Sequence, residues 1–565
     1  MAHPPARGIP ATTSTTGPIA ARRGLPGRRR GSSSVTGTWA LVRFFLRRDR
    51  LKLPGWVAGL GLYVAYVGSA VPGIAPTQAE LDGVALLINS PVARMWVGPA
   101  YGMDAVTYER FFAAGYALYL YILAALMSIL LVTRHTRGEE QSGRAELVRA
   151  NVVGRHAPLT AAMIVAAITN LLAGAVSTAT LVGVGFAAAG SLLIGAATTL
   201  TGLAFAGITA ITVQLTENSR AAAGLAGGVL GLAFMVRALG DMMAVGGSNL
   251  SWFSPLSWGL QAAPYVLDRW WPLALAAGLA VVTIGLGYLL AAHRDFGAGM
   301  LPARRGRWEA SARLGTPIGL ALRLQRSGLI GWGVVIVVFA VIDGAFGQAM
   351  LDAAGQMPPV LVDMFGGTSG LADGYLAFLA EFSGYLGVAY VVFAVQGLLV
   401  EENRGRAELI LSTPTSRSAW AGSHLGVITV NVLLIMVAAG AFAGLGYATV
   451  TGDWSAVGTS LVAHLNLVPA VTVVVGVSAL LYGWAPRLLA PVGWTLVGAV
   501  FFFGVFAQLM DLPDWVLKIS PLSHPAKMPV EAFEAAPVLV LLGLTVAGCL
   551  LGLVGLRQRQ VVNKG

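Results

Sequence analysis

Apolar stretches of about 20 residues or more, long enough to cross a membrane, recur along most of the chain. Six of them precede a basic segment near the middle and six follow it. They cover 54–72, 112–133, 158–188, 190–215, 221–240, 271–292, 329–347, 378–400, 419–450, 460–485, 487–510 and 535–556. The third and fourth are almost continuous, with a break expected around Gly185 to Gly190. The pattern predicts an all-α polytopic membrane protein of about twelve transmembrane helices.

The composition agrees with a membrane protein and excludes several other classes. Hydrophobic residues make up 56% of the chain and charged residues only 11%, whereas a soluble protein carries about 25% charged residues. The single cysteine, Cys549, lies in an apolar run, which excludes a disulfide framework and a cysteine-based metal or iron–sulfur site. Residues 1–36 are rich in Pro, Gly, Ser, Thr and Arg without an apolar period, so we expect a disordered basic tail.

Positive charges fall almost entirely on one side of the predicted topology. With the N-terminus inside, 31 of the 37 Lys and Arg residues lie in inside segments and five lie in outside segments. This asymmetry follows the positive-inside rule and predicts a multi-pass plasma-membrane protein with both termini in the cytoplasm. The first 52 residues hold eleven basic side chains against one acidic residue, Asp49. Such a tail is expected to lie on the anionic inner leaflet, and no nucleic-acid partner is expected.

The two sets of six stretches are related in sequence as well as in hydropathy. Residues 139–147 (EEQSGRAEL) and 401–409 (EENRGRAEL) are identical at seven of nine positions, at an offset of 262. Weaker echoes pair 254–257 with 520–523 and 47–56 with 323–332. Each echo falls on the same side of the membrane in both sets, so we expect two parallel repeats about an axis along the membrane normal. The expected units are a tail (1–36), a first six-span half (37–300), a cytoplasmic linker with the elbow of the second half (301–328), a second six-span half (329–556) and a cytoplasmic C-terminal tail (557–565).

The strongest motif is the repeated E-E-x-x-G-R-A-E-L, which follows the second span of each half. Helical spacing predicts an i,i+4 ion pair between Glu140 and Arg144, repeated by Glu402 and Arg406. The glycine inside the motif, Gly143 in the first copy, breaks the helix or allows close approach of another backbone. A self-paired, solvated helix end would explain a single copy. Near-identical recurrence between diverged spans favours a surface on which two identical partners dock.

The arrangement resembles the membrane permeases of ABC-2-type exporters, which have an elbow before span one, an acidic coupling region after span two and an external Ser-Pro-Leu element. Over residues 38–556 the chain looks like the double-length actinobacterial permeases of the tetronasin-resistance, polyketide-antibiotic exporter type. The resemblance implies that a set of coupling residues in each half receives the motion of an ATPase. They are Glu139, Glu140, Gly143, Arg144, Glu146, Leu147 and Arg155, with Glu401, Glu402, Gly405, Arg406, Glu408, Leu409, Pro414 and Arg417. The second half keeps the family pattern at Pro414 and Ser416, whereas the first half has Val152 and Gly154 there.

The sequence contains no ATP-binding motif of its own. Its four lysines are Lys52, Lys518, Lys527 and Lys564, and none follows the glycine loop of a G-x-x-x-x-G-K-[ST] motif. The resemblance therefore implies that ATP and Mg²⁺ are bound by a separate ABC ATP-binding subunit, present in two copies, one for each half. We expect no catalytic residue, cofactor or metal in this chain, which would be a permease and not an enzyme.

The resemblance also implies that spans two and five of each half line the substrate route. The side chains expected near it are Tyr116, Tyr119, Phe234, Met235, Phe393, Gln396, Phe502 and Phe506. The Ser-Pro-Leu elements lie beside tryptophans and are either an external gate or part of an interfacial aromatic belt. The gate residues are Ser254, Pro255, Leu256, Ser520, Pro521 and Leu522. Aromatic and Met-rich spans suit a hydrophobic small-molecule cargo, and the resemblance implies export of drugs or polyketide-type antibiotics.

The sequence leaves other functions open. Lipids or cell-envelope precursors are alternative cargos for an ABC exporter. A twelve-span secondary multidrug carrier would share the span count and the two halves, but it has no need of the repeated acidic motif. A membrane enzyme is disfavoured because the seven histidines form no metal-binding motif. Arg237 with Asp241, and His464, are interpreted as self-paired or snorkelling groups, and no recurring row of buried carboxylates supports a proton relay.

Overall fold

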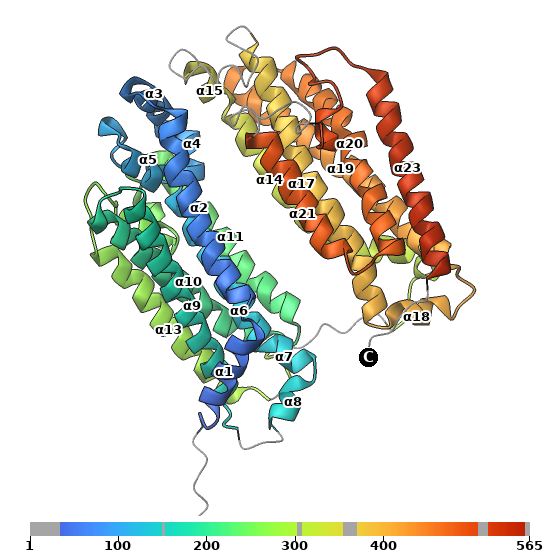
Figure 1. The fold of residues 1–565 in the computed structure, drawn as a ribbon, viewed down its shortest axis with the longest axis horizontal. Helices are drawn as coiled ribbons and strands as arrows, with labels where there is room; N and C mark the ends of the chain where they lie inside the picture. The colour runs from blue at the N-terminus through green and yellow to red at the C-terminus, as the bar shows by residue number, and fades with distance from the viewer. Residues whose placement is uncertain are drawn as a thin grey trace, which may run out of the picture.

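The chain is helical throughout the parts that the computed structural model describes (Figure 1). The described residues are 34–149, 153–295, 297–301, 308–353, 370–506 and 518–559. Within these ranges, eleven helices are long and apolar enough to cross a membrane. A twelfth apolar helix, α21 (Leu489–Phe506), is shorter, and its last residue is the last one described before residue 518. The predicted all-α polytopic membrane fold is confirmed. Most of the predicted tail (1–33), part of the predicted linker (302–307) and the last six residues lie outside the described residues.

The first half supplies six spans, each overlapping a predicted stretch. They are α2 (Lys52–Ile74), α6 (Ala117–His135), α9 (Ala157–Gly183), α10 (Ala188–Leu215), α11 (Ser219–Met243) and α13 (Trp271–His293). The expected break between the third and fourth spans lies where Gly185 adopts a φ of 101°, a conformation that glycine tolerates without strain. An additional short helix, α1 (Thr38–Arg48), precedes α2 as a separate elbow.

The second half supplies the other six spans. They are α14 (Pro317–Ala345), α17 (Leu371–Asn403), α19 (Arg417–Thr451), α20 (Ala456–Trp484), α21 and α23 (Ala535–Gln558). Its elbow differs from that of the first half. The α14 helix begins at Pro317, capped by the Thr316 hydroxyl, which accepts a hydrogen bond from the Gly319 amide at 3.1 Å, and it continues without a break into the seventh span. The elbow sequence of the second half is thus the first part of a transmembrane helix.

The two halves stand beside each other with corresponding helices facing inward (Figure 1). The α2, α6 and α11 helices lie toward the second half, and α14, α17 and α21 lie toward the first. The remaining spans pack on the outer sides, where small residues allow close approach of helices. A Cβ at Gly174 would collide with the backbone of Gly195 on the next helix, and a Cβ at Gly483 would collide with Gly552.

Short helices fill the connection between the first two spans, at the end opposite the elbow. They are α3 (Gln78–Asn89), α4 (Pro91–Val97) and α5 (Tyr108–Gly115). Thr77 and Glu80 form a capping box at the start of α3, which fixes where that helix begins. The apolar pattern placed the start of span two at residue 112, inside α5. The structure instead breaks the helix at Tyr116 and begins the span at Ala117.

Candidate functional site

The repeated acidic motif folds as two helical segments joined at a glycine. In the first half, α7 (Arg137–Gln141) and α8 (Arg144–Arg149) flank Gly143. In the second half, the end of α17 and α18 (Arg406–Leu411) flank Gly405. The two glycines have φ angles of 72° and 70°, which residues with a Cβ rarely adopt. The chain therefore turns sharply inside the motif, and residues on its two sides do not share one helix face.

This turn changes the ion pairs that helical spacing predicted. The Glu140–Arg144 and Glu402–Arg406 pairs are wrong, because an i,i+4 contact needs an unbroken helix. Arg144 pairs instead with the first glutamate of its motif, with its Nε 3.2 Å from an oxygen of Glu139. The second half repeats this choice: Arg406 Nε donates to Glu401 at 2.6 Å. This hydrogen bond raises the pKa of Arg406 above its ordinary value, so the side chain stays charged.

The second glutamate of each motif binds an arginine at the end of the last span of its own half. Glu140 accepts a hydrogen bond from Arg294 at 2.7 Å, just after α13 ends. Glu402 accepts two from Arg559, both at 2.8 Å, just after α23 ends. Sequence reasoning missed both arginines, although their offset of 265 residues lies within the range of the other echoes.

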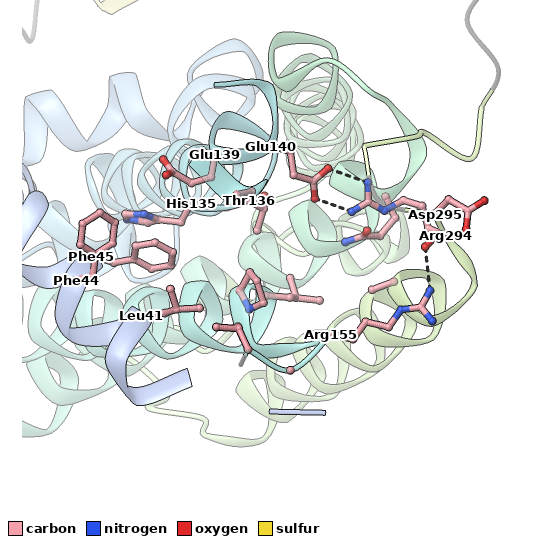
Figure 2. Close-up of a pocket in the computed structure, with 17 residues that line it drawn as sticks. Leu41, Phe44, Phe45, His135, Thr136, Glu139, Glu140, Arg155, Arg294 and Asp295 are labelled. Atoms are coloured by element: carbon pink, nitrogen blue, oxygen red, sulfur yellow. Dashed lines mark hydrogen bonds and ion pairs between the residues drawn. The ribbon is translucent and has the colours of Figure 1, made fainter. Parts of the chain in front are cut away.

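In each half, a second arginine binds the backbone of the arginine that holds the glutamate. Arg155 donates to the backbone carbonyl of Arg294 at 2.9 Å, as Figure 2 shows. Arg417 donates to the carbonyl of Arg559 at 2.6 Å. We call each set a Glu–Arg–Arg clamp: Glu140, Arg294 and Arg155 in the first half, and Glu402, Arg559 and Arg417 in the second. Each clamp ties the segment after span two to the end of the last span and to the segment that leads into span three.

The clamp glutamates are largely shielded from water, and the side chain of Glu140 is 14% exposed. Glu402 is only 3% exposed and also accepts a hydrogen bond from Tyr482 at 2.9 Å. Glu140 is paired a second time, with the buried Arg137 at 2.7 Å. Removing one partner of a buried ion pair costs about 3–5 kcal/mol, because the other charge stays buried without compensation. These two glutamates therefore hold the permease together and are not available as a docking surface.

Other residues of the motif remain at the surface. The side chain of Arg144 is 59% exposed and Leu409 is 73% exposed. Glu146, Glu408 and Pro414 are exposed as well. The side chain of Leu147 is outside the described part of the chain. Of the residues predicted to take part in coupling, these exposed ones are the part that a partner is able to contact.

The first half holds its elbow to the motif through charges that the second half lacks. Arg48 of α1 pairs with Glu139 at 2.6 Å. Asp49 lies 2.8 Å from Arg134 and 3.1 Å from the Nε2 of His135. We call these five residues the elbow lock. The repeat offsets pair Arg48, Asp49, Arg134 and His135 with four second-half positions that are all uncharged: Leu324, Gln325, Gln396 and Gly397.

A cavity of about 380 Å³ lies between the elbow and the motif of the first half (Figure 2). Leu41, Phe44 and Phe45 of α1 form part of its apolar wall. Figure 2 shows Arg155 and Asp295 on the other side, with the clamp between Glu140 and Arg294 above. The elbow, the motif and the end of the last span thus meet around one space.

Aromatic side chains connect the two halves farther from the elbow. Trp96 of α4 lies between Phe234 of α11, with ring centroids 5.9 Å apart, and Phe339 of α14, at 4.5 Å. The series continues from Phe339 to Phe382 at 6.3 Å and from Phe382 to Phe501 at 6.4 Å. We call these five residues the aromatic bridge. One of its residues, Phe234, was predicted to lie near the substrate route. The other four were not among the residues predicted from spans two and five.

The other predicted route residues lie around this region without forming one cluster. Phe393 is exposed and packs against Trp332 at 6.0 Å, and Phe502 is partly exposed beside Phe503. The remaining described members, Tyr116, Tyr119, Met235 and Gln396, are half-buried. The side chain of Phe506 is outside the described residues.

The two Ser-Pro-Leu elements form the same local turn. The Ser254 hydroxyl accepts a hydrogen bond from the Leu256 amide, and the Ser520 hydroxyl accepts one from the Leu522 amide, both at 3.3 Å. Both leucines are buried in the core of their own half, so each element is anchored inward. Tryptophans accompany the first element: the half-buried Trp252 stacks on the exposed Trp271 with ring centroids 4.9 Å apart. These rings are typical of an interfacial belt, and the gate remains a prediction.

Buried ionisable groups near the spans have partners within the protein. Arg237 and Asp241 are fully buried and 3.2 Å apart, which agrees with the predicted self-pairing. Arg94 donates to the Asp241 carbonyl at 3.0 Å and so ties α4 to α11. Burial lowers the pKa of Arg94, and the Asp241 charge opposes this shift. His464 lies 3.1 Å from the Ser383 hydroxyl and 2.8 Å from the Ser460 carbonyl.

Comparison with known proteins gives the chain a family. The family model described as "Multidrug efflux system permease Rv1217c, C-terminal domain" matches residues 40–291 and 314–557, which cover the two six-span halves. The chain is 35% identical over 539 residues to the multidrug efflux system permease protein Rv1217c of Mycobacterium tuberculosis, covering 94% of this chain and 96% of that protein. Match and structure agree over nearly the whole length, and the chain therefore belongs to the multidrug efflux system permease family typified by Rv1217c.

Proposed function

We propose that this chain is the membrane permease of an ABC-2-type exporter of the tetronasin-resistance class. It moves hydrophobic or amphiphilic drugs, or polyketide-type antibiotics, outward across the plasma membrane. Both termini are cytoplasmic, which places the elbow and the clamps on the inner side. ATP and Mg²⁺ bind to a separate subunit, two copies of which dock on the segments 137–155 and 399–417.

The observation that carries this proposal is the Glu–Arg–Arg clamp, which occurs in both halves. A partner that displaces the segment after span two pulls directly on the end of the last span, because Glu140 and Glu402 bind Arg294 and Arg559. Two clamps of the same design need two partners of the same shape. A secondary carrier, driven by an ion gradient within its own spans, has no use for such paired attachments.

The route in this proposal runs between the two halves. Both clamps act symmetrically on the space between the halves, and helices of spans one, two and five face it from each side (Figure 1). The aromatic bridge crosses that space at Trp96 and Phe339. Aromatic surfaces bind apolar cargo through many weak contacts, which suits transport of diverse hydrophobic molecules.

Docking is tested by charge reversal at the exposed motif residues. The variant E146K/E408K, co-expressed with the ATP-binding-cassette protein encoded nearest to the permease, should no longer co-purify with it and should lose ATP-dependent efflux. The control is E217K/E309K, which reverses two exposed glutamates on the same side, outside the motif. Undiminished co-purification and efflux in E146K/E408K would contradict the docking assignment. Efflux that persists without any ATPase but stops when the proton gradient is removed would instead identify a secondary carrier.

A further inference from the structure

A second hollow lies on the other side of the elbow from the cavity of Figure 2. It is a groove of about 670 Å³ where the chain turns from α1 into α2 against α9. We call it the elbow groove. Its walls come from Val57 and Ala58 of α2 and from Ile168, Leu172 and Val176 of α9, with further apolar side chains at the turn.

The groove follows from how α2 packs on α9. The two helices touch closely at Gly61, where an added Cβ would lie 2.7 Å from a methyl group of Val176. Toward the elbow, α2 begins at Lys52 and small Ala58 leaves space against α9. Leu172 is 52% exposed, so the groove opens at the outer surface of the first half. It is closed at one end by helix contact and open toward the elbow at the other.

The dimensions suit one hydrocarbon chain. From Ile168 to Val176 the wall rises about 12 Å, at 1.5 Å per residue. One leaflet of the hydrocarbon core is about 15 Å thick. An acyl chain lying along α9 would therefore be covered over most of its depth in the leaflet.

The polar end of the groove has a single charge and it is positive. Arg50 lines the groove at the turn and makes no hydrogen bond or ion pair with any residue in the described ranges. Thr169, the other polar side chain of the lining, already donates to the Val165 carbonyl at 2.8 Å. No carboxylate of the described residues lines the groove. A ligand that fills it must be apolar along α9 and gains most from a negative charge beside Arg50.

We propose that the elbow groove binds one anionic phospholipid of the inner leaflet, with an acyl chain along α9 and the phosphate on Arg50. The placement in the inner leaflet rests on the orientation given under Proposed function. Arg48 and Asp49, the two residues before Arg50, belong to the elbow lock. The elbow lock holds the turn between α1 and α2 through contacts within the protein. A lipid bound to Arg50 would hold the same turn through a contact with the membrane.

The test measures lipid binding to the purified permease without an ATPase. Native mass spectrometry with added phosphatidylglycerol should show one lipid retained in preference to phosphatidylcholine. R50Q should weaken the retention of phosphatidylglycerol about fivefold, the loss expected for one basic contact with an anionic lipid. The matched control is R47Q, which removes another exposed arginine of the elbow that does not line the groove.

A second pair of variants tests the apolar part. L172W fills the groove and should reduce lipid retention, whereas L171W places the same side chain on the neighbouring lipid-facing position, which does not line it. Equal retention by R50Q and R47Q, or equal retention of the two lipids by the unaltered permease, would overturn the proposal. Because no transport is measured, this outcome is independent of whether an ATPase drives the permease. If the docking test fails while the lipid result holds, only the transport proposal is wrong.

Discussion

The two halves can be compared at the end of the molecule that carries the acidic motifs. One arrangement of charged residues is present there in both halves, and another is present in the first half only. Both close a Glu–Arg–Arg clamp between the acidic motif, the end of the last span and the segment before span three. Only the first half adds the elbow lock, in which Arg48 and Asp49, at the end of a separate elbow helix, pair with Glu139 of the motif and with Arg134 at the end of span two. In residues 308–353 of the second half the elbow sequence is the beginning of α14 and forms no separate helix of this kind.

The difference indicates which parts are needed in duplicate. A movement passed from the acidic motif to the last span uses groups present in both halves. A movement passed from the motif to the elbow uses charges in the first half only. The two proposed coupling sites are therefore built alike toward the last span and unlike toward the elbow.

The largest effect is expected where the halves agree. E140K/E402K places positive charge against Arg294 and Arg559 in the interior, so we expect a loss of about 3–5 kcal/mol in the free energy of unfolding at each clamp. Any protein that still inserts should hydrolyse ATP with its partner without efflux. Efflux assays and thermal unfolding of membrane preparations measure both effects.

The milder substitutions E140Q and E402Q, made one at a time, show whether the two clamps carry equal weight. Unequal losses of efflux would mean that the halves are not equivalent even where their structures match. The control E309Q changes an exposed glutamate outside the motif and should leave the free energy of unfolding within about 0.5 kcal/mol of that of the unaltered protein. Normal efflux by the E140K/E402K variant would show that transport does not depend on the clamps.

The next effect concerns the route. Trp at Phe234 and Phe502 adds bulk on span five of each half, and the double variant should reduce ATPase-dependent efflux of a hydrophobic drug toward the level of cells lacking the permease. Phe234 belongs to the aromatic bridge, whereas Phe502 lies beside it. F234W alone is therefore expected to reduce efflux more than F502W alone. Drug accumulation in expressing cells is the measurement, and unchanged efflux in the double variant would place the route elsewhere.

A smaller effect is expected where the halves differ. D49N removes the charge that binds Arg134 and His135, and should cost about 2 kcal/mol in the free energy of unfolding, because Arg134 is partly exposed and water screens part of the loss. R43Q, on the exposed face of the same helix, is the matched control and should have little effect. Denaturant or thermal unfolding of the purified permease distinguishes the two. Equal stability of D49N and R43Q would show that the lock contributes nothing measurable.

The smallest effect is expected from removal of the tail. A tail disordered over the whole of 1–36 would be dispensable throughout, but residues 34–36 are held in place: the carbonyls of Ser34 and Thr36 accept hydrogen bonds from the amides of His156 and Gly154 at 2.8 and 2.9 Å. Deleting residues 1–33 should therefore leave efflux and stability unchanged. Deleting 1–37 should destabilise the protein by about 1 kcal/mol for each lost hydrogen bond. Loss of efflux at equal expression after the shorter deletion would show that the tail has a role of its own.

The sequence predicts the spans because each depends on a local run of apolar residues, and it marks the motif because the repeat is visible by alignment. The partners of the motif are not predictable in this way. Glu140 and Arg294 are 154 residues apart, and they meet because α13 and α6 both pack against α10. The i,i+4 rule failed at Arg144 because Gly143 turns the backbone into the left-handed region. Trp96, which joins the two halves of the aromatic bridge, was missed because it lies on a short helix between spans, outside the apolar runs that guided the choice of route residues. Phe382 and Phe501 lie on spans two and five, but the sequence does not show which aromatic side chains of a span meet.

Each clamp draws all of its groups from its own half, so neither depends on the peptide that joins them. The covalent link instead acts as a tether: it sets the ratio of the two halves at one to one and keeps them at a high effective concentration. The contact of Trp96 with Phe339 therefore does not need to be strong enough to assemble two separate chains from dilute solution in the membrane. An interface freed from that requirement is able to loosen and re-form in every cycle without the risk that the halves separate.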